Sequence, residues 1–326
     1  MKLVVCFDGT WNEASTRTNV WKLKQDLDCS AGSDTQATYI EGIGTIPGTK
    51  WRGGLFAVDF DRPLGLGYRW LTKKMLNAPK GEEIAVYIFG FSRGAYIAHT
   101  LSWLLHEVGV PCRFANAIPL AQAYAKKDCK AIEKLKKDGI LPSPKIEMLG
   151  LWDAVTSPHD VFKRYHDAER APNVKWIYHA MATDERREWY GAMQYEPMPR
   201  IVQTWFSGVH KDVGGGYPED ECELSDIALD WMKRNAEHRG LKFRNPLGER
   251  PRRYDLSALK KIHNEEASYD PIKVREYHRC QLVDRSVRDR VKTQSGYFPS
   301  LAAVPVRLIE WLNGARGYAL RFARRM

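Results

Sequence analysis

The sequence alternates short apolar runs with helical patterns, and this alternation constrains the fold more than any other feature. Five runs are apolar enough to be strands buried on both faces, at residues 3–7, 38–43, 83–91, 145–155 and 202–209. Patterns with helical spacing lie between them, at residues 19–29, 68–76, 95–106, 117–137, 174–190 and 224–238. Such alternation is typical of a mainly parallel sheet with helices on both faces. The sequence therefore predicts an α/β fold.

The composition favours an ordinary globular protein. The chain has 326 residues, of which 44% are hydrophobic and 28% charged. No apolar run approaches the ~20 residues that a transmembrane helix needs, and the start, MKLVVCFD, reads as a first strand and not as a signal peptide. The six cysteines are scattered without a Cys-x-x-Cys pair, which favours reduced cysteine over disulfides or a zinc site. We therefore expect a protein that is cytoplasmic as synthesised.

Positive charge is concentrated near the C-terminus. Residues 1–240 hold 31 basic and 31 acidic side chains, whereas residues 241–326 hold 19 basic and 9 acidic ones. The later region is irregular and basic at 244–253, and residues 304–322 have the pattern of an amphipathic basic helix. We therefore predict a core at 1–240 and a basic, mainly helical extension at 241–326 that packs on it. The extension can be a lid, a partner site or a dock for an anionic membrane, and a solvated face explains its charge equally well.

A serine lies between two glycines where a predicted strand runs into a predicted helix. Residues 90–94 read Gly-Phe-Ser-Arg-Gly. This pattern in this context is typical of a nucleophile elbow, a sharp turn that exposes the serine hydroxyl. Gly90 and Gly94 are then needed because neighbouring backbone passes too close for a side chain. The alternative is an ordinary tight turn that contains Ser92, and the strand-to-helix context favours the elbow.

Three predicted strands end in residues that suit nucleophilic catalysis. Ser92 follows the third strand, Asp153 ends the fourth and His210 ends the fifth. Because parallel strands have their carboxyl ends at one edge of the sheet, these side chains are expected to meet. The order Ser, Asp, His along the chain is that of α/β-hydrolases. We predict that Ser92 is the nucleophile, His210 the base and Asp153 the acid that orients it, with Asp212 and Asp184 as alternative acids.

Backbone amides near Ser92 can form an oxyanion hole. One is the amide of Arg93 at the helix N-terminus, and another comes from the loop after the first strand, where Gly9 or Thr10 can donate and Asp8 holds the loop. An aspartate after the first strand also suits an aspartyl-phosphate phosphatase, but that chemistry needs a second aspartate where Thr10 stands. The His-Asp pairs at 159–160 and 166–167 match no metal motif, and no nucleotide-binding loop or nucleic-acid module is recognisable. The sequence predicts no metal, no cofactor and no specific nucleic acid.

Six blocks resemble a known family. They are CFDGTWN (6–12) with TNV (18–20), YIEGIGT (39–45), GFSRGAY (90–96), GLWDAVTS (150–157), YHAMATDERREWY (178–190) and FSGVHKDVGGGY (206–217). In this order they resemble the α/β-hydrolase family of type VI secretion phospholipase effectors over about residues 1–240. The resemblance implies that the family's Ser, Asp and His correspond to Ser92, Asp153 and His210. It implies hydrolysis of phospholipid esters without a cofactor, and export by a specialised secretion system.

The residues and the resemblance together predict a serine hydrolase that cleaves carboxylic esters of lipids through a Ser-His-Asp triad and an acyl-enzyme. Phospholipid is the first candidate substrate. Two alternatives stay open: a non-catalytic binding or scaffold protein on the same fold, and a housekeeping esterase that acts on a non-lipid acyl substrate. The block at 178–190 is expected to be a helix that braces the sheet edge. Nothing in the sequence indicates an oligomeric state.

Overall fold

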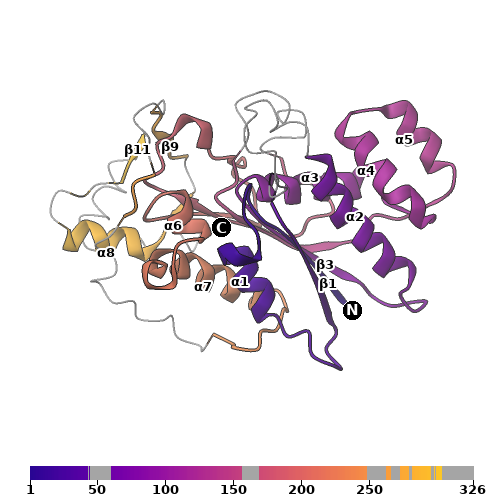
Figure 1. The fold of residues 1–326 in the computed structure, drawn as a ribbon, viewed down its shortest axis with the longest axis horizontal. Helices are drawn as coiled ribbons and strands as arrows, with labels where there is room; N and C mark the ends of the chain where they lie inside the picture. Colours follow the sequence, from indigo (N-terminus) through magenta and orange to yellow (C-terminus); the bar gives the residue numbers. More distant parts are fainter. Residues whose placement is uncertain are drawn as a thin grey trace.

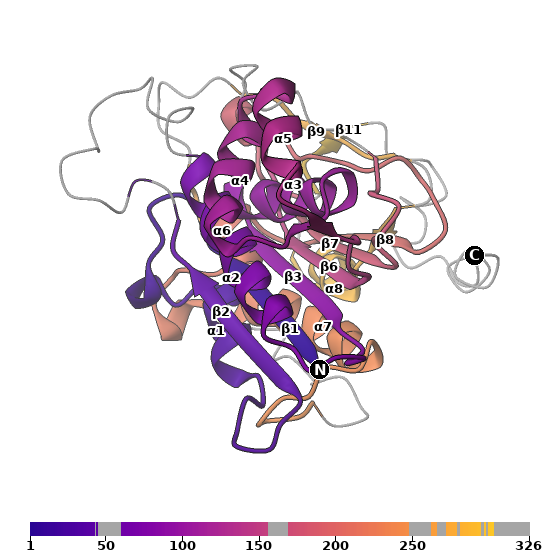
Figure 2. The same cartoon turned by 90° about the vertical axis from the view of Figure 1, so that its right-hand side faces the viewer.

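A seven-stranded parallel sheet forms the centre of the fold (Figure 1). The computed structural model describes residues 1–42, 44, 60–155, 169–247, 262–265, 272–278, 281–294, 297 and 299–302. The sheet strands are β1 (Lys2–Phe7), β2 (Thr35–Ile40), β3 (Ala85–Phe91), β6 (Ile146–Trp152), β7 (Ile177–Ala182), β8 (Ile201–Phe206) and β10 (Leu282–Val283). Their order is β10-β8-β7-β6-β3-β1-β2. Figure 2 shows the strands from β2 to β8 side by side. The predicted α/β class is confirmed.

Helices cover both faces of this sheet, as predicted. They are α1 (Asn19–Asp26), α2 (Asp61–Leu76), α3 (Arg93–Glu107), α4 (Ala117–Ala125), α5 (Cys129–Lys136), α6 (His210–Gly214), α7 (Glu223–His238) and α8 (Arg285–Thr293). Successive side chains of β1 point to opposite faces, because strand side chains alternate. Leu3, Val5 and Phe7 join the apolar cluster that includes α2 and α3, whereas Val4 and Cys6 join the cluster that includes α1 and α7. The sheet is therefore buried on both faces.

The chain beyond residue 240 also contributes to the sheet. Strand β10 pairs with β8 at the sheet edge, and α8 follows it directly. Strands β9 (Arg275–Glu276) and β11 (Leu301–Ala302) form a small parallel sheet, and β4 (Val110–Pro111) and β5 (Ile140–Leu141) form an antiparallel pair. The helix expected at 304–322 lies outside the described residues, and the division at residue 240 stays a prediction. None of the described helices combines the length and apolarity that a membrane crossing requires.

Two predicted helices are wrong in part. The helix expected over 174–190 is instead strand β7 followed by a turn and a short 3-10 helix, Glu188–Tyr190. All residues of β7 are buried between β6 and β8, and a short apolar run has no period that distinguishes a buried strand from a buried helix. The helix expected over 117–137 is divided into α4 and α5, because Lys127 has a φ of 53° and Asp128 caps the second helix.

Candidate active site

Ser92 occupies a strained turn between β3 and α3. Its φ of 57° and ψ of −128° lie in a region that side-chain-bearing residues rarely adopt. A Cβ atom at Gly90 would lie 2.5 Å from the Cα atom of Ala95, and one at Gly94 would lie 2.3 Å from the carbonyl oxygen of Asp8. Both contacts are with backbone atoms that cannot rotate away. Only glycine therefore fits at positions 90 and 94 of this turn.

Ser92, His210 and Asp153 form one buried chain of hydrogen bonds. The Oγ atom of Ser92 lies 2.9 Å from Nε2 of His210, and Nδ1 of His210 lies 2.6 Å from Oδ2 of Asp153. Ser92 is 3% exposed, His210 4% and Asp153 0%. The three residues follow β3, β8 and β6, so the parallel sheet brings them to one edge. An imidazole held between a hydroxyl and a carboxylate can take the proton of the hydroxyl.

The Asp153 carboxylate is held in place from several sides. Its Oδ1 atom accepts a hydrogen bond of 2.8 Å from the amide of Ala182, and its own amide donates to the carbonyl of Ala180. The guanidinium of Arg275 donates to Oδ1 at 2.6 Å and to Oδ2 at 2.9 Å. Burial alone would raise the pKa of Asp153, but the charge of Arg275 and the contact with His210 outweigh it and hold this pKa below its ordinary value. Asp153 is therefore ionised at neutral pH.

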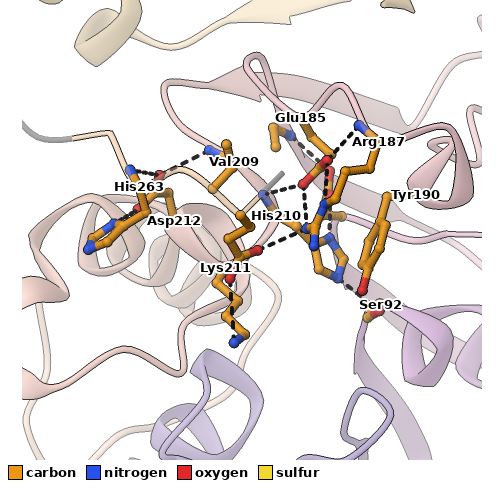
Figure 3. Close-up of polar contacts among 12 residues, drawn as sticks. Ser92, Glu185, Arg187, Tyr190, Val209, His210, Lys211, Asp212 and His263 are labelled. Carbon is orange, nitrogen blue, oxygen red and sulfur yellow. Dashed lines mark hydrogen bonds and ion pairs between the residues drawn. The ribbon is translucent and has the colours of Figure 1, made fainter. Parts of the chain in front are cut away.

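The two alternative acids have other partners. Asp212 accepts from the amide of Val209 at 3.0 Å, and its Oδ1 atom lies 2.6 Å from Nδ1 of His263. In Figure 3 Asp212 lies beside His263, whereas the ring of His210 points toward Ser92. Within the described residues, the contacts of the Asp212 carboxylate are with groups other than the imidazole of His210.

Asp184 is the second alternative acid, and it braces the loop before α6. Its Oδ2 atom accepts from the hydroxyl of Thr183 and from the amide of Gly208, both at 2.7 Å. Burial raises the pKa of Asp184, so this carboxyl takes up a proton more readily than an exposed one. The structure thus brings Asp153 to His210, and places Asp212 and Asp184 in supporting positions.

The imidazole of His210 is packed between aromatic rings. The ring centre of Phe91 lies 4.6 Å away, and that of Tyr190 lies 4.9 Å away in an edge-on arrangement. The guanidinium of Arg187 stacks on Tyr190 at 3.7 Å and donates twice to Glu185. The Glu185 carboxylate also accepts from the backbone amide of His210 at 3.2 Å (Figure 3). The sequence did not indicate these supports. Three of them, Glu185, Arg187 and Tyr190, belong to the block at 178–190, which had no assigned chemistry.

Asp8 holds the loop after β1. Its Oδ1 atom accepts from the amide of Gly9 at 2.7 Å, and its Oδ2 atom accepts from the hydroxyls of Thr18 and Tyr39, both at 2.6 Å. Burial raises the pKa of Asp8 to about 6, although these hydrogen bonds oppose the effect. The carboxylate thus connects the loop to the N-cap of α1 and to strand β2.

The same loop lies against the serine. A Cβ atom at Gly9 would lie 3.0 Å from the Cβ atom of Ser92. The amide of Gly9 is already donated to Asp8, so of the two candidate donors the amide of Thr10 is the better placed to serve a ligand. The Oγ1 atom of Thr10 is also buried, without a hydrogen-bond partner in the described part of the chain. This loop therefore carries unused donor capacity close to Ser92.

Comparisons with known proteins show the family of this chain. Residues 1–235 match the family described as T6SS, Phospholipase effector Tle1-like, catalytic domain. The uncharacterized protein YEL023C of Saccharomyces cerevisiae is 27% identical over an alignment of 235 residues, and the match covers 62% of this chain and 34% of that protein.

Two solved structures resemble this chain, and the first of them supports the fold. An uncharacterized protein from Pseudomonas aeruginosa has a TM-score of 0.53 at 19% identity, over 74% of this chain and 46% of that one. The Tle1 effector bound to the VgrG spike of the type 6 secretion system has a TM-score of 0.41 at 20% identity, over 67% and 51%. The chain spans about a third of the yeast relative and about half of each solved chain. Because the family match covers well over half of the sequence, the chain belongs to the Tle1-like phospholipase effectors of type VI secretion, through their catalytic domain.

Proposed function

We propose that the chain is a serine hydrolase that cleaves the carboxylic esters of lipids, with phospholipids as the first candidate. The observation that carries the proposal is the hydrogen-bonded chain from Ser92 through His210 to Asp153, which begins at a strained strand-to-helix turn. The same three residue types in the same order serve acyl transfer on α/β-hydrolase folds. Membership of a phospholipase effector family supports a lipid substrate.

Acylation starts when the Oγ atom of Ser92 attacks the ester carbonyl carbon. The Nε2 atom of His210 takes the hydroxyl proton as the new C–O bond forms. The developing oxyanion accepts hydrogen bonds from the amide of Arg93, the first residue of α3, and from an amide of the Gly9–Thr10 loop. The tetrahedral intermediate then expels the alcohol portion of the lipid, which receives its proton from His210. A water molecule repeats the sequence on the acyl-enzyme and releases the fatty acid.

Asp153 keeps the imidazole in the productive orientation. Its hydrogen bond holds the proton on Nδ1, so that Nε2 faces Ser92 as an acceptor. Because the carboxylate is ionised, it stabilises the imidazolium that forms during attack. Apart from the attacking water, the proposal assigns these steps to side chains and backbone amides of the chain.

The setting of the enzyme is part of the same proposal. Export by a type VI secretion system is the context that the family's description names. The ten excess positive charges of residues 241–326 favour contact with anionic lipid surfaces. A non-catalytic binding protein and an esterase for non-lipid acyl substrates are the competing outcomes of the test below.

The test is hydrolysis of vesicles made from phosphatidylcholine and phosphatidylglycerol, with released fatty acid and lysophospholipid measured by mass spectrometry. Ser92→Ala and His210→Ala are compared with the wild type and with Ser30→Ala, a control at an exposed serine that contacts Asp28. We expect product from the wild type and the control, and a loss on the order of 1,000-fold or more in the other two variants.

Four other results would point elsewhere. Full hydrolysis by Ser92→Ala contradicts the proposal. Cleavage of short soluble esters without cleavage of vesicles supports the esterase alternative, and folded wild type that cleaves neither supports a binding protein. Phosphatase activity that needs Mg²⁺ and survives Ser92→Ala would assign the chemistry to Asp8 instead.

A further inference from the structure

Arg275 reaches the catalytic site from outside the family match. It lies in β9, forty residues beyond the matched range of 1–235, and it is almost fully buried. Its Nη1 and Nη2 atoms donate to the two oxygens of Asp153, at 2.6 and 2.9 Å. A two-pronged contact of this kind matches the planar guanidinium to the planar carboxylate, which lysine cannot reproduce.

The same guanidinium ties together the backbone around His210. Nη1 also donates to the carbonyl of Ala182 at 3.0 Å, at the end of β7, and Nη2 donates to the carbonyl of Tyr190 at 2.6 Å. The ring of Tyr190 packs edge-on against the imidazole of His210. Arg275 thus contacts both the carboxylate that binds the imidazole and the turn that confines it.

We propose that Arg275 is a positioning residue of the active site. It fixes the plane of the Asp153 carboxylate, and its positive charge partly cancels the effect of the carboxylate's negative charge on His210. The inference rests on the proposed function, because it assigns a role within that machinery. The Oδ2 atom of Asp153 is shared between Nδ1 of His210 and Nη2 of Arg275. The positive charge therefore weakens the electrostatic attraction between the carboxylate and an imidazolium at His210.

Other charged and titratable groups also surround the His210–Asp153 pair. Among the described residues they are Glu185, Arg187, Tyr190, Lys211, Glu265 and His179. Glu185 and Arg187 form an ion pair with each other, and Lys211 pairs with Glu265, so much of their charge is balanced locally. His179 is neutral near pH 7, because burial lowers its pKa to about 4. Arg275 is the cation in contact with the carboxylate itself.

The test is the pH dependence of labelling by a fluorophosphonate, whose phosphorus Ser92 attacks as fluoride leaves. The rate constant falls at low pH as the His210–Asp153 pair takes up a proton, and this fall defines the acid limb. In Arg275→Gln we expect the acid limb to move to higher pH by about 1 unit, because a buried positive charge next to the pair is lost. This direction holds whichever member of the pair carries the added proton. The plateau rate is expected to fall on the order of 100-fold, from misplacement of the carboxylate.

Two further variants separate charge from geometry. Arg275→Lys keeps the charge and loses the two-pronged contact, so its acid limb should stay at the wild-type pH while its plateau rate falls. Lys273→Gln removes an exposed positive charge two residues away and should match the wild type in both respects. Removal of one partner of a buried ion pair destabilises a protein. If Arg275→Gln does not fold, the plateau rate of Arg275→Lys decides whether Arg275 positions the carboxylate. A wild-type plateau rate in Arg275→Lys, or an unshifted acid limb in folded Arg275→Gln, overturns the inference.

A second measurement tests the role of Arg275 even if the proposed hydrolase function fails. If the folded wild type does not label, the serine-hydrolase proposal fails. The titration of the downfield Nδ1 proton of His210 by NMR, assigned with His210→Ala, then still decides the role of Arg275. A midpoint raised in Arg275→Gln supports the charge offset, and an unchanged midpoint contradicts it.

Discussion

Gly94 is the point at which the serine turn is packed against the first strand, and replacing it tests that packing. A methyl group there would lie 2.3 Å from the carbonyl oxygen of Asp8 and 2.5 Å from that of Phe7. Real Cβ atoms essentially never come closer than 3.0 Å, so α3 or the end of β1 must move by at least about 0.7 Å. Overpacking of this kind costs about 1–3 kcal/mol, partly offset by the roughly 0.5–1 kcal/mol that alanine gains over glycine in a helix.

We therefore expect Gly94→Ala to lower the free energy of unfolding by about 1–2 kcal/mol, which for a chain of 326 residues corresponds to a fall in Tm of about 1.5–3 °C. The movement also displaces the Gly9–Thr10 loop from Ser92, so the rate of fluorophosphonate labelling should fall on the order of 100-fold. Thermal melts and labelling rates measure the two effects.

The matched control is Gly65→Ala. Gly65 is also a buried helical glycine, in α2, but a Cβ atom there would meet its nearest neighbours at 3.8 Å, an ordinary contact distance. We expect this control to keep its activity and its Tm, or to gain slightly in stability. If Gly94→Ala melts and labels like Gly65→Ala, the close packing of the turn on β1 is refuted.

Three further predictions concern the acid, a buried histidine and the basic region. Asp153→Asn should reduce the labelling rate by roughly 1,000- to 10,000-fold, whereas Asp212→Asn, whose carboxylate faces His263, should lose less than about tenfold; equal losses would remove Asp153 from its proposed role. Burial lowers the pKa of His179 from 6.5 to about 4, so the stability that depends on its neutral form is complete above pH 6.5 and is lost as the pH falls toward 4. The free energy of unfolding, measured in denaturant melts, should fall by about 3 kcal/mol over this range in the wild type, and this fall should be absent in His179→Gln. If His179→Gln shows the same pH dependence as the wild type, His179 is not its cause. Because residues 241–326 carry ten excess positive charges, binding to vesicles that contain phosphatidylglycerol should weaken steeply with added salt, and salt-independent binding would exclude an electrostatic dock.

The strand-to-helix turn could be predicted because its signal is local. The motif is two glycines around a serine, after an apolar run and before a helical pattern. It can be recognised from neighbouring residues alone. The three residues Ser92, Asp153 and His210 could likewise be placed at one sheet edge, because the carboxyl ends of parallel strands lie on the same side. The predicted limits were less accurate: the strand expected over 202–209 ends at Phe206, and His210 begins α6.

The choice of acid depended on helical geometry that the sequence did not reveal. With His210 as the first residue of α6, the residue two positions later is rotated by about 200° around the helix axis. Asp212 therefore faces His263, on the far side from Ser92, although it is close to His210 along the chain. The sequence predicted that His210 ends a strand, and that prediction did not indicate which way the side chain of Asp212 would point.

Arg275 could not have been found by reading motifs. It meets Asp153 across 122 positions of sequence, from a segment that has neither a motif nor a strong pattern. Strand β7 was missed for a related reason, because its burial comes from neighbours on both sides that the local sequence does not specify. Both features depend on tertiary contacts and not on local propensity.

The most direct test of Ser92 as the nucleophile is to identify the residue that a fluorophosphonate modifies. Purified wild type, Ser92→Ala and His210→Ala are treated with the reagent, and the site is located by peptide mass spectrometry. We expect one phosphonyl group on Ser92 in the wild type, none in Ser92→Ala and far slower labelling in His210→Ala. Labelling of another residue, or a folded wild type that stays unmodified, would contradict the claim that Ser92 is an activated nucleophile.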